Sequence, residues 1–199
     1  MTAAELFLTG DARADALLAA DPNALLIGMV LDQQVTMEKA FVGPAVIAER
    51  MGGRLDVGAI AQSDPESFSA ICAQRPAVHR FPGAMAKRIQ ATCQVLMDRY
   101  DGSAENIWAE VTSGAELRDR IASLPGFGAQ KAAIFTALLG KQYGVQPPGW
   151  EEAAGPYGEP GSFRSVADVV DPASLEKVRA SKKAAKAAVK ADRLAAASG

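Results

Sequence analysis

The sequence predicts an all-α fold, and three observations support that prediction. Apolar residues recur at helical spacing in several segments that Gly and Pro separate. None of these segments shows the apolar–polar alternation of a half-buried strand. With 49% hydrophobic and 22% charged residues, the 199-residue chain can bury a core. We therefore expect one domain, either simple or compact and two-lobed, built from helices.

Each expected helix has recognisable start and stop signals. Asp21-Pro22 is typical of an N-cap followed by a first helical residue, and it predicts an apolar helix over residues 23–34. Thr36 predicts the start of the next helix, which Gly52-Gly53 ends. The other expected helices are a short one within residues 1–21, ESFSAICAQ after Asp64-Pro65, residues 84–100, a turn at residues 106–108, and residues 115–123 and 130–141.

The residue types exclude several classes of function. Cys72 and Cys93 are too few for a disulfide scaffold or an iron–sulfur cluster. His79 is the single histidine, so catalysis by a metal or by a Ser-His-Asp triad has almost no residues to use. No run of about 18 apolar residues predicts a membrane span, and the first residues lack a secretory pattern. We expect a cytoplasmic protein without a membrane partner.

Charge is distributed unevenly along the chain. Residues 1–172 carry 14 Lys and Arg against 21 Asp and Glu, whereas residues 173–199 carry 7 against 2. An acidic body with a short basic tail does not coat nucleic acid by bulk charge. Any nucleic-acid binding therefore requires a local patch.

Composition divides the chain into three parts. Residues 1–141 form a helical core, and residues 142–171 form a Gly/Pro-rich loop of a length that is usually functional or disordered. Residues 172–199 are rich in Ala and Lys and form a basic helix or tail. Its lysines at positions 182, 186 and 190 share a helix face, which fits either contact with a DNA backbone or a solvated terminus.

Residues 115–140 predict a helical hairpin. One helix ends at Pro125, the chain reverses through Gly126-Phe127-Gly128, and a second apolar helix follows at once. Glycines allow positive φ and expose backbone N–H groups at the positive end of the second helix, where a phosphate binds readily. The alternative is that these glycines only make a tight turn.

The hairpin segment AELRDRIASLPGFGAQKAAIFTALLG resembles the helix-hairpin-helix motif of the base-excision DNA glycosylase (HhH-GPD) superfamily, which includes endonuclease III and the alkyl-purine glycosylases. LLIGMVLDQQVT resembles the first core helix of that family with its glutamine-containing turn, and PGAMAKRIQATCQVL resembles the helix before the hairpin. The three segments follow the family order over residues 22–141. The resemblance implies a two-lobed helical bundle with double-stranded DNA in the groove between the lobes, and a nucleoid-associated protein. The chain departs from the family in lacking the four-cysteine signature, so we expect no iron–sulfur cluster and no redox cofactor. The resemblance implies a monovalent cation at the hairpin carbonyls as the one candidate ion.

The resemblance also implies which residues contact DNA. Gln34, or its neighbour Gln33, and Phe81 match the positions that push into the duplex when a nucleotide swings out. The alternative is that Gln34 caps a helix and Phe81 is core. The remaining candidates in the hairpin are Gly126, Phe127, Gly128, Gln130 and Lys131. A cluster of charged residues around the turn at Phe81 is a further candidate for contact with phosphates, with a merely solvated surface as the alternative: His79, Arg80, Lys87 and Arg88.

The chemistry that the resemblance implies is hydrolysis of an N-glycosidic bond with an acid as stabiliser. Family members that also cut the strand carry a lysine where this chain has Gln130, and Lys131 lies about 100° further around the helix. Asp168, before a helix start, is the first candidate for the acid, Glu151 and Glu152 are the second, and loss of the acid is the third interpretation.

Two loop aromatics, Trp150 and Tyr157, are candidates to stack on bases, whereas Trp108 is expected in the core. The leading hypothesis is a monofunctional DNA N-glycosylase of base-excision repair. The alternative is a DNA-damage or DNA-structure binding protein that has lost the catalytic acid, and a third interpretation is a helical interaction module unrelated to DNA.

Overall fold

The computed structural model describes residues 5–197, except the side chains of residue 186 and residues 189–197. All regular structure in this part of the chain is helical, which confirms the predicted all-α class. The helices are α1 Ala12–Ala20, α2 Pro22–Leu31, α3 Met37–Arg50, α4 Val57–Gln62, α5 Pro65–Ala73, α6 Pro82–Arg99, α7 Glu105–Trp108, α8 Gly114–Ala122, α9 Ala129–Gln142, α10 Trp150–Ala154 and α11 Pro172–Ala197, with 3-10 turns η1 Gly155–Tyr157 and η2 Val166–Asp168.

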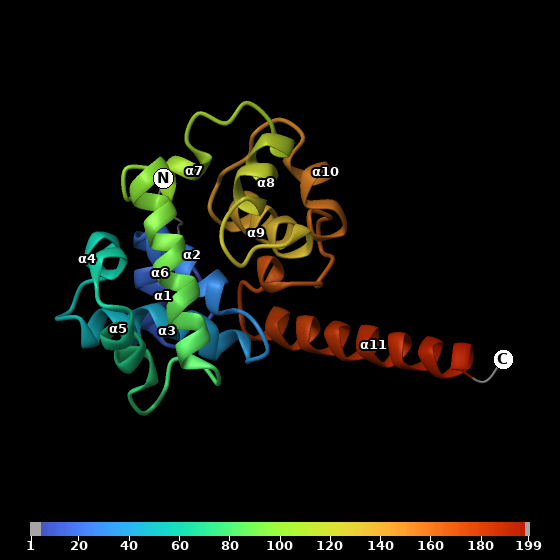
Figure 1. The fold of residues 1–199 in the computed structure, drawn as a ribbon. Helices are drawn as coiled ribbons and strands as arrows, with labels where there is room; N and C mark the ends of the chain where they lie inside the picture. The colour runs from blue at the N-terminus through green and yellow to red at the C-terminus, as the bar shows by residue number, and fades with distance from the viewer. Residues whose placement is uncertain (1–4, 198–199) are drawn as a thin grey trace.

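Helix α2 is the central element of the N-terminal part. It is apolar on every side, and its residues from Ala24 to Leu31 are buried. It packs against α1, α3 and α6, while α4 and α5 pack against α6 (Figure 1). The Asp21 carboxylate accepts a hydrogen bond from the N–H of Asn23 at 2.9 Å, so the predicted N-cap is confirmed. Thr36 caps α3 in the same way.

Helix α9 has the same central position among α8, α10 and η2, which pack around it beside the N-terminal helices (Figure 1). The edge of Trp108 meets the rings of Phe135 and Tyr143, so its predicted place in the core is confirmed. The Tyr143 hydroxyl donates to the backbone oxygen of Ala19 at 3.1 Å. This contact ties the end of α9 to α1.

Three expectations about element boundaries were wrong. Helix α2 ends at Leu31 rather than near Gln34, and α4 was missed. Residues 142–171 are not one long loop, because they contain α10, η1 and η2. Gly149 starts α10 with a left-handed φ of 74°, a conformation that favours glycine.

Trp150 opens α10 and fixes its place on α9. A Cβ atom at Gly140 would lie only 2.2 Å from the indole, so the ring rests directly on the α9 backbone. The expectation that Trp150 stacks on bases from a free loop is therefore wrong. Only a residue without a Cβ atom leaves room for this ring at position 140.

Helix α11 confirms the predicted C-terminal helix. The Asp171 carboxylate caps it by accepting from the N–H of Ser174 at 2.6 Å. The helix begins beside η2 and then extends away from the rest of the molecule (Figure 1). The predicted lysine face includes Lys186 and Lys190, whose side chains lie outside the described part of the chain.

No single helix within residues 5–197 has the length and apolar character to cross a membrane. The pair α1 and α2 meets those criteria only together, with a bend of 116° between the two helices.

Replacing Gly140 by Ala should destabilise the protein by about 1–3 kcal/mol, because the added methyl group overlaps the Trp150 indole. Urea unfolding measures the change. Gly128→Ala is the matched control, since a Cβ atom there meets nothing within 4 Å. Equal stability of the two variants would contradict the role of Gly140.

Candidate nucleic-acid interface

The turn between α8 and α9 is exposed at the surface. Gly126 has a φ of 81°, and Gly128 precedes α9 in extended conformation. Gly126, Gly128, Ala129 and Gln130 are all exposed. The first-turn N–H groups of Ala129, Gln130 and Lys131 have no backbone or side-chain acceptor among residues 5–197. Together with the positive end of α9, these donors form a place where an anion can bind.

Phe127 anchors this turn instead of contacting a partner. Its side chain is buried against Phe135, and its N–H donates to the oxygen of Leu124 at 3.1 Å. The Lys131 ammonium lies 5.5 Å from the centre of its ring. The Phe127 side chain, which was a candidate for contact with DNA, is therefore packed inside the protein and stabilises the turn.

A groove of about 990 Å³ opens beside the hairpin. Its walls come from the end of α2, the turn over residues 32–36, helix α9, the segment over residues 156–164 and helix α11. The residues that line it are Met29, Asp32, Gln34, Val35, Thr36, Arg80, Gln130, Lys131, Ile134, Pro156, Tyr157, Arg164, Ser181, Lys182 and Ala185.

The groove is locally basic although the body of the protein is acidic. Arg80, Lys131, Arg164 and Lys182 line it, and Asp32 is the one carboxylate among its described lining residues. This is the kind of local patch that the charge distribution requires for binding to a polyanion.

The structure separates the two glutamines of the turn after α2. Gln33 is held in place, because its amide nitrogen donates to the oxygen of Val30 at 2.6 Å and its amide oxygen accepts from Arg88. Gln34 has a left-handed φ of 55°, is exposed and lines the groove. Gln34 caps no helix, since Thr36 is the N-cap of α3.

His79 connects this turn to the turn that carries Phe81. Its Nε2 lies 2.7 Å from the backbone oxygen of Gln33, and its Nδ1 accepts from the N–H of Phe81 at 3.0 Å. These partners place the proton on Nε2. The ring is 1% exposed, so the expectation that His79 meets a phosphate is wrong.

Phe81 lies at the surface and not in the core. Its side chain is 44% exposed, with the Arg80 guanidinium 4.6 Å from the centre of the ring. The alternative interpretation of Phe81 as core is therefore wrong. Phe81 and Gln34 stand on two turns that His79 holds together.

Two residues of α9 that the sequence singled out are held in place by partners in the protein. The Lys131 ammonium donates to the oxygens of Met29 at 2.8 Å and Val30 at 3.4 Å, at the end of α2. The Gln130 amide donates to the Tyr157 hydroxyl at 2.8 Å. The pKa of Lys131 is lowered to about 8, chiefly because of burial, while nearby Asp32 raises it and Arg88 lowers it.

The two basic residues of α6 differ in their surroundings. Lys87 and Arg88 are both exposed. A Cβ atom at Gly126 would lie 3.4 Å from Cδ of Arg88, so this side chain rests on the hairpin turn while its guanidinium reaches Gln33.

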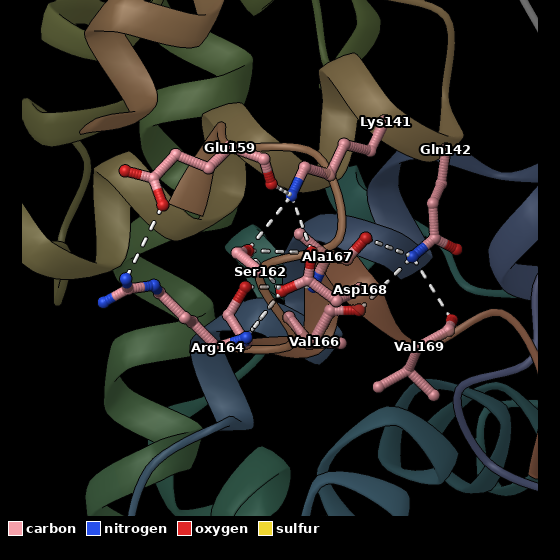
Figure 2. Close-up of polar contacts among 10 residues, drawn as sticks. Lys141, Gln142, Glu159, Ser162, Arg164, Val166, Ala167, Asp168 and Val169 are labelled. Carbon is pink, nitrogen blue, oxygen red and sulfur yellow. Dashed lines mark hydrogen bonds and ion pairs between the residues drawn. The ribbon is translucent and has the colours of Figure 1, made fainter. Parts of the chain in front are cut away.

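The carboxylate of Asp168 lies in a buried network of hydrogen bonds (Figure 2). It pairs with the Lys141 ammonium at 2.6 Å, and it accepts from the N–H groups of Arg164 at 2.8 Å and Ser165 at 3.1 Å. The Ser162 hydroxyl is a further donor at 3.2 Å. This network fastens the segment before η2 to α9.

None of the three predicted carboxylates lines the groove. Asp168 is turned into its own network, and Glu151 and Glu152 are exposed on α10. Their assignment as the catalytic acid stays a prediction. The carboxylate that does line the groove, Asp32, was missed, although it is the only acid in the segment LLIGMVLDQQVT.

Comparison of the chain with protein-family models, with curated proteins and with solved structures gives no match. Within residues 5–197, no group of three or more His, Cys, Asp and Glu side chains could hold a metal ion.

Asp168→Asn should destabilise the protein by about 3 kcal/mol, because it leaves the buried Lys141 ammonium without its counter-charge. Chemical denaturation measures the loss. The matched control is Glu159→Gln, which removes an exposed pair with Arg164 at 3.6 Å and should cost less than about 1 kcal/mol. An Asp168→Asn variant as stable as the control would show that the network is dispensable.

Lys131 should make stability depend on alkaline pH. In the unfolded chain this lysine keeps its proton up to about its ordinary pKa of 10.5, whereas the folded protein releases it near 8. Because the unfolded state then binds more protons, the free energy of unfolding of the wild type should rise relative to that of Lys131→Met between these two pH values. Parallel urea titrations test this, and a constant difference across the range would refute it.

Proposed function

We propose that this protein binds double-stranded DNA in base-excision repair, through a two-lobed helix-hairpin-helix architecture, and hydrolyses the N-glycosidic bond of a damaged or modified base. The observation that carries the proposal is the exposed α8–α9 turn beside a basic groove. Backbone N–H groups without an acceptor lie at the start of α9, and four cationic side chains line the groove beside it. The sugar-phosphate backbone of a nucleic acid offers phosphate oxygens both to the N–H donors and to the cationic side chains.

The hairpin supports binding of a phosphate without relying on bulk charge. Backbone N–H groups at the start of α9 hold an anion by direct donation, and the helix dipole adds to this. Arg80, Arg164 and Lys182 line the groove along which a strand would continue. Such contacts position a duplex without reading its sequence.

The two turns held by His79 support extrusion of a nucleotide. Gln34 offers an amide, and Phe81 offers an exposed aromatic ring, from neighbouring turns at the groove. Unstacking a base costs a few kcal/mol, which apolar and hydrogen-bonding groups that fill the gap can offset. Tyr157, held by Gln130, supplies a further aromatic group in the groove.

The state of Lys131 supports hydrolysis without cleavage of the strand. Its ammonium is occupied by two backbone oxygens of α2, so it is not free to attack a sugar. Water is then the nucleophile, and no redox cofactor takes part in the proposed reaction.

One observation favours the alternative function, a non-catalytic binder of DNA damage or DNA structure. Neither Asp168 nor the two glutamates of α10 reaches the groove. A protein of this kind would bind damaged duplexes and release no base.

Gly128 offers a sharp test of the binding proposal. Asp at the N-cap of α9 should preserve or raise stability, because it is a preferred capping residue and a Cβ atom has free space there. The same carboxylate repels a phosphate at the turn, so Gly128→Asp should weaken binding of a duplex that carries a tetrahydrofuran abasic analogue by about tenfold or more. Fluorescence anisotropy at low salt measures this, with Gly128→Ala as the matched control.

Two results would overturn the proposed binding: no affinity of the wild type for this duplex at low salt, or equal affinity of the Asp and Ala variants. Base release is tested separately with duplexes that each carry one alkylated, oxidised, deaminated or crosslinked base. Appearance of abasic sites supports the glycosylase, and binding without release on every substrate supports the non-catalytic alternative.

A further inference from the structure

Asp32 occupies a distinctive place in the molecule. It follows the last residue of α2, and its N–H continues the helix by donating to the oxygen of Gly28 at 3.0 Å. Its side chain lines the groove two residues before Gln34. In contrast to Asp168, its carboxylate has no hydrogen-bond donor among the described residues.

The hydrogen bonds of the Lys131 ammonium do not depend on this carboxylate. The Lys131 ammonium already has two oxygen acceptors at the end of α2, so it stays satisfied when Asp32 is removed. A half-buried carboxylate without hydrogen bonds costs folding free energy. Groups that are kept in a cleft at such a cost are candidates for chemistry.

We propose that Asp32 is the catalytic carboxylate of the groove, an inference that rests on the proposed glycosylase function. It accepts a proton from the attacking water as the water oxygen bonds to C1′ of the extruded nucleotide. The C1′–N bond breaks with its electron pair on the base, which takes a proton from solvent. Asp32 then returns its own proton to solvent, so the products are the free base and an abasic sugar.

The surroundings of Asp32 suit this role. Burial raises its pKa, while Lys182 and Lys131 lower it and Glu38 raises it. The carboxylate is therefore a stronger base than an exposed aspartate and is still held close to two cations. The charged groups that line the same groove are Lys131 on α9, Lys182 on α11, Arg80 before α6 and Arg164 before η2. Glu38 on α3 is a further charged neighbour of Asp32 and lies outside the groove lining.

The test is single-turnover base release by the full chain on the panel of damaged duplexes described above. Asp32→Asn should slow release by about 100-fold or more, because it cannot accept the proton. Its affinity for the tetrahydrofuran duplex should stay within about threefold of the wild type, and its thermal midpoint should equal or exceed that of the wild type. Asp32→Glu, which keeps the carboxylate, should retain part of the rate. Glu66→Gln, at an exposed carboxylate of α5 outside the groove, is the matched control that should release base at the wild-type rate, and Glu151→Gln and Glu152→Gln test the carboxylates of α10 in the same assay.

The dependence of the rate on pH distinguishes a catalytic from a structural role of Asp32, because a purely structural role would leave the shape of the pH profile unchanged. The rate for the wild type should fall on the acid side, at a pH above the ordinary aspartate value of 3.8, and Asp32→Asn should lose this limb.

Three outcomes would overturn the assignment. Release by Asp32→Asn within about threefold of the wild type would remove Asp32 from the chemistry and leave the glycosylase proposal standing. Loss of release in Glu151→Gln or Glu152→Gln, with Asp32→Asn active, would transfer the role to α10. Binding without release by the wild type on every substrate would overturn both the role of Asp32 and the glycosylase proposal.

Discussion

The turn that follows α2 is the constraint on which the groove depends. Gln33 in this turn receives Arg88 from α6 with its side chain and His79 from the segment before α6 with its backbone oxygen, and the last residues of α2 just before the turn receive Lys131 from α9. These contacts join parts of the chain that are up to 102 residues apart. Because these donors come from distant segments and meet at one place, they fix the hairpin helix relative to the N-terminal helices. The groove is the space that this arrangement leaves open.

Charge at this groove shows why net charge alone is a poor guide to a binding surface. The chain has a formal net charge of −2, and its first 172 residues are acidic. The fold nevertheless gathers Arg80, Lys131, Arg164 and Lys182 from distant segments around one space. Since screening limits electrostatic attraction to about 10 Å at moderate salt, a polyanion placed in the groove would respond to these neighbours and not to the acids elsewhere.

Asp168 and Asp32 illustrate different physical roles for the same side chain. Asp168 has an ion pair and several donors, so its charge is compensated and it holds a segment in place. Asp32 accepts no hydrogen bond from the described residues and interacts with nearby cations only through their charge, and burial raises its pKa. A carboxylate whose lone pairs already accept hydrogen bonds from the protein has none left for a substrate. A carboxylate without such bonds beside an open groove has lone pairs that a substrate can use. This difference underlies the proposal for Asp32, and sequence context alone does not reveal it.

Local features of the chain could be predicted because their causes are local. An aspartate before a proline caps α2, Thr36 caps α3, and the glycine-rich turn after Pro125 reverses the chain, each through hydrogen bonds or φ values within a few residues. The all-α class follows from apolar spacing in the same way. Tertiary structure decided the rest: that Gln34 and not Gln33 is free, that Trp150 packs on Gly140, and that Asp32 reaches the groove. These outcomes depend on which distant side chains compete for the same acceptors and space, and no local pattern encodes that competition.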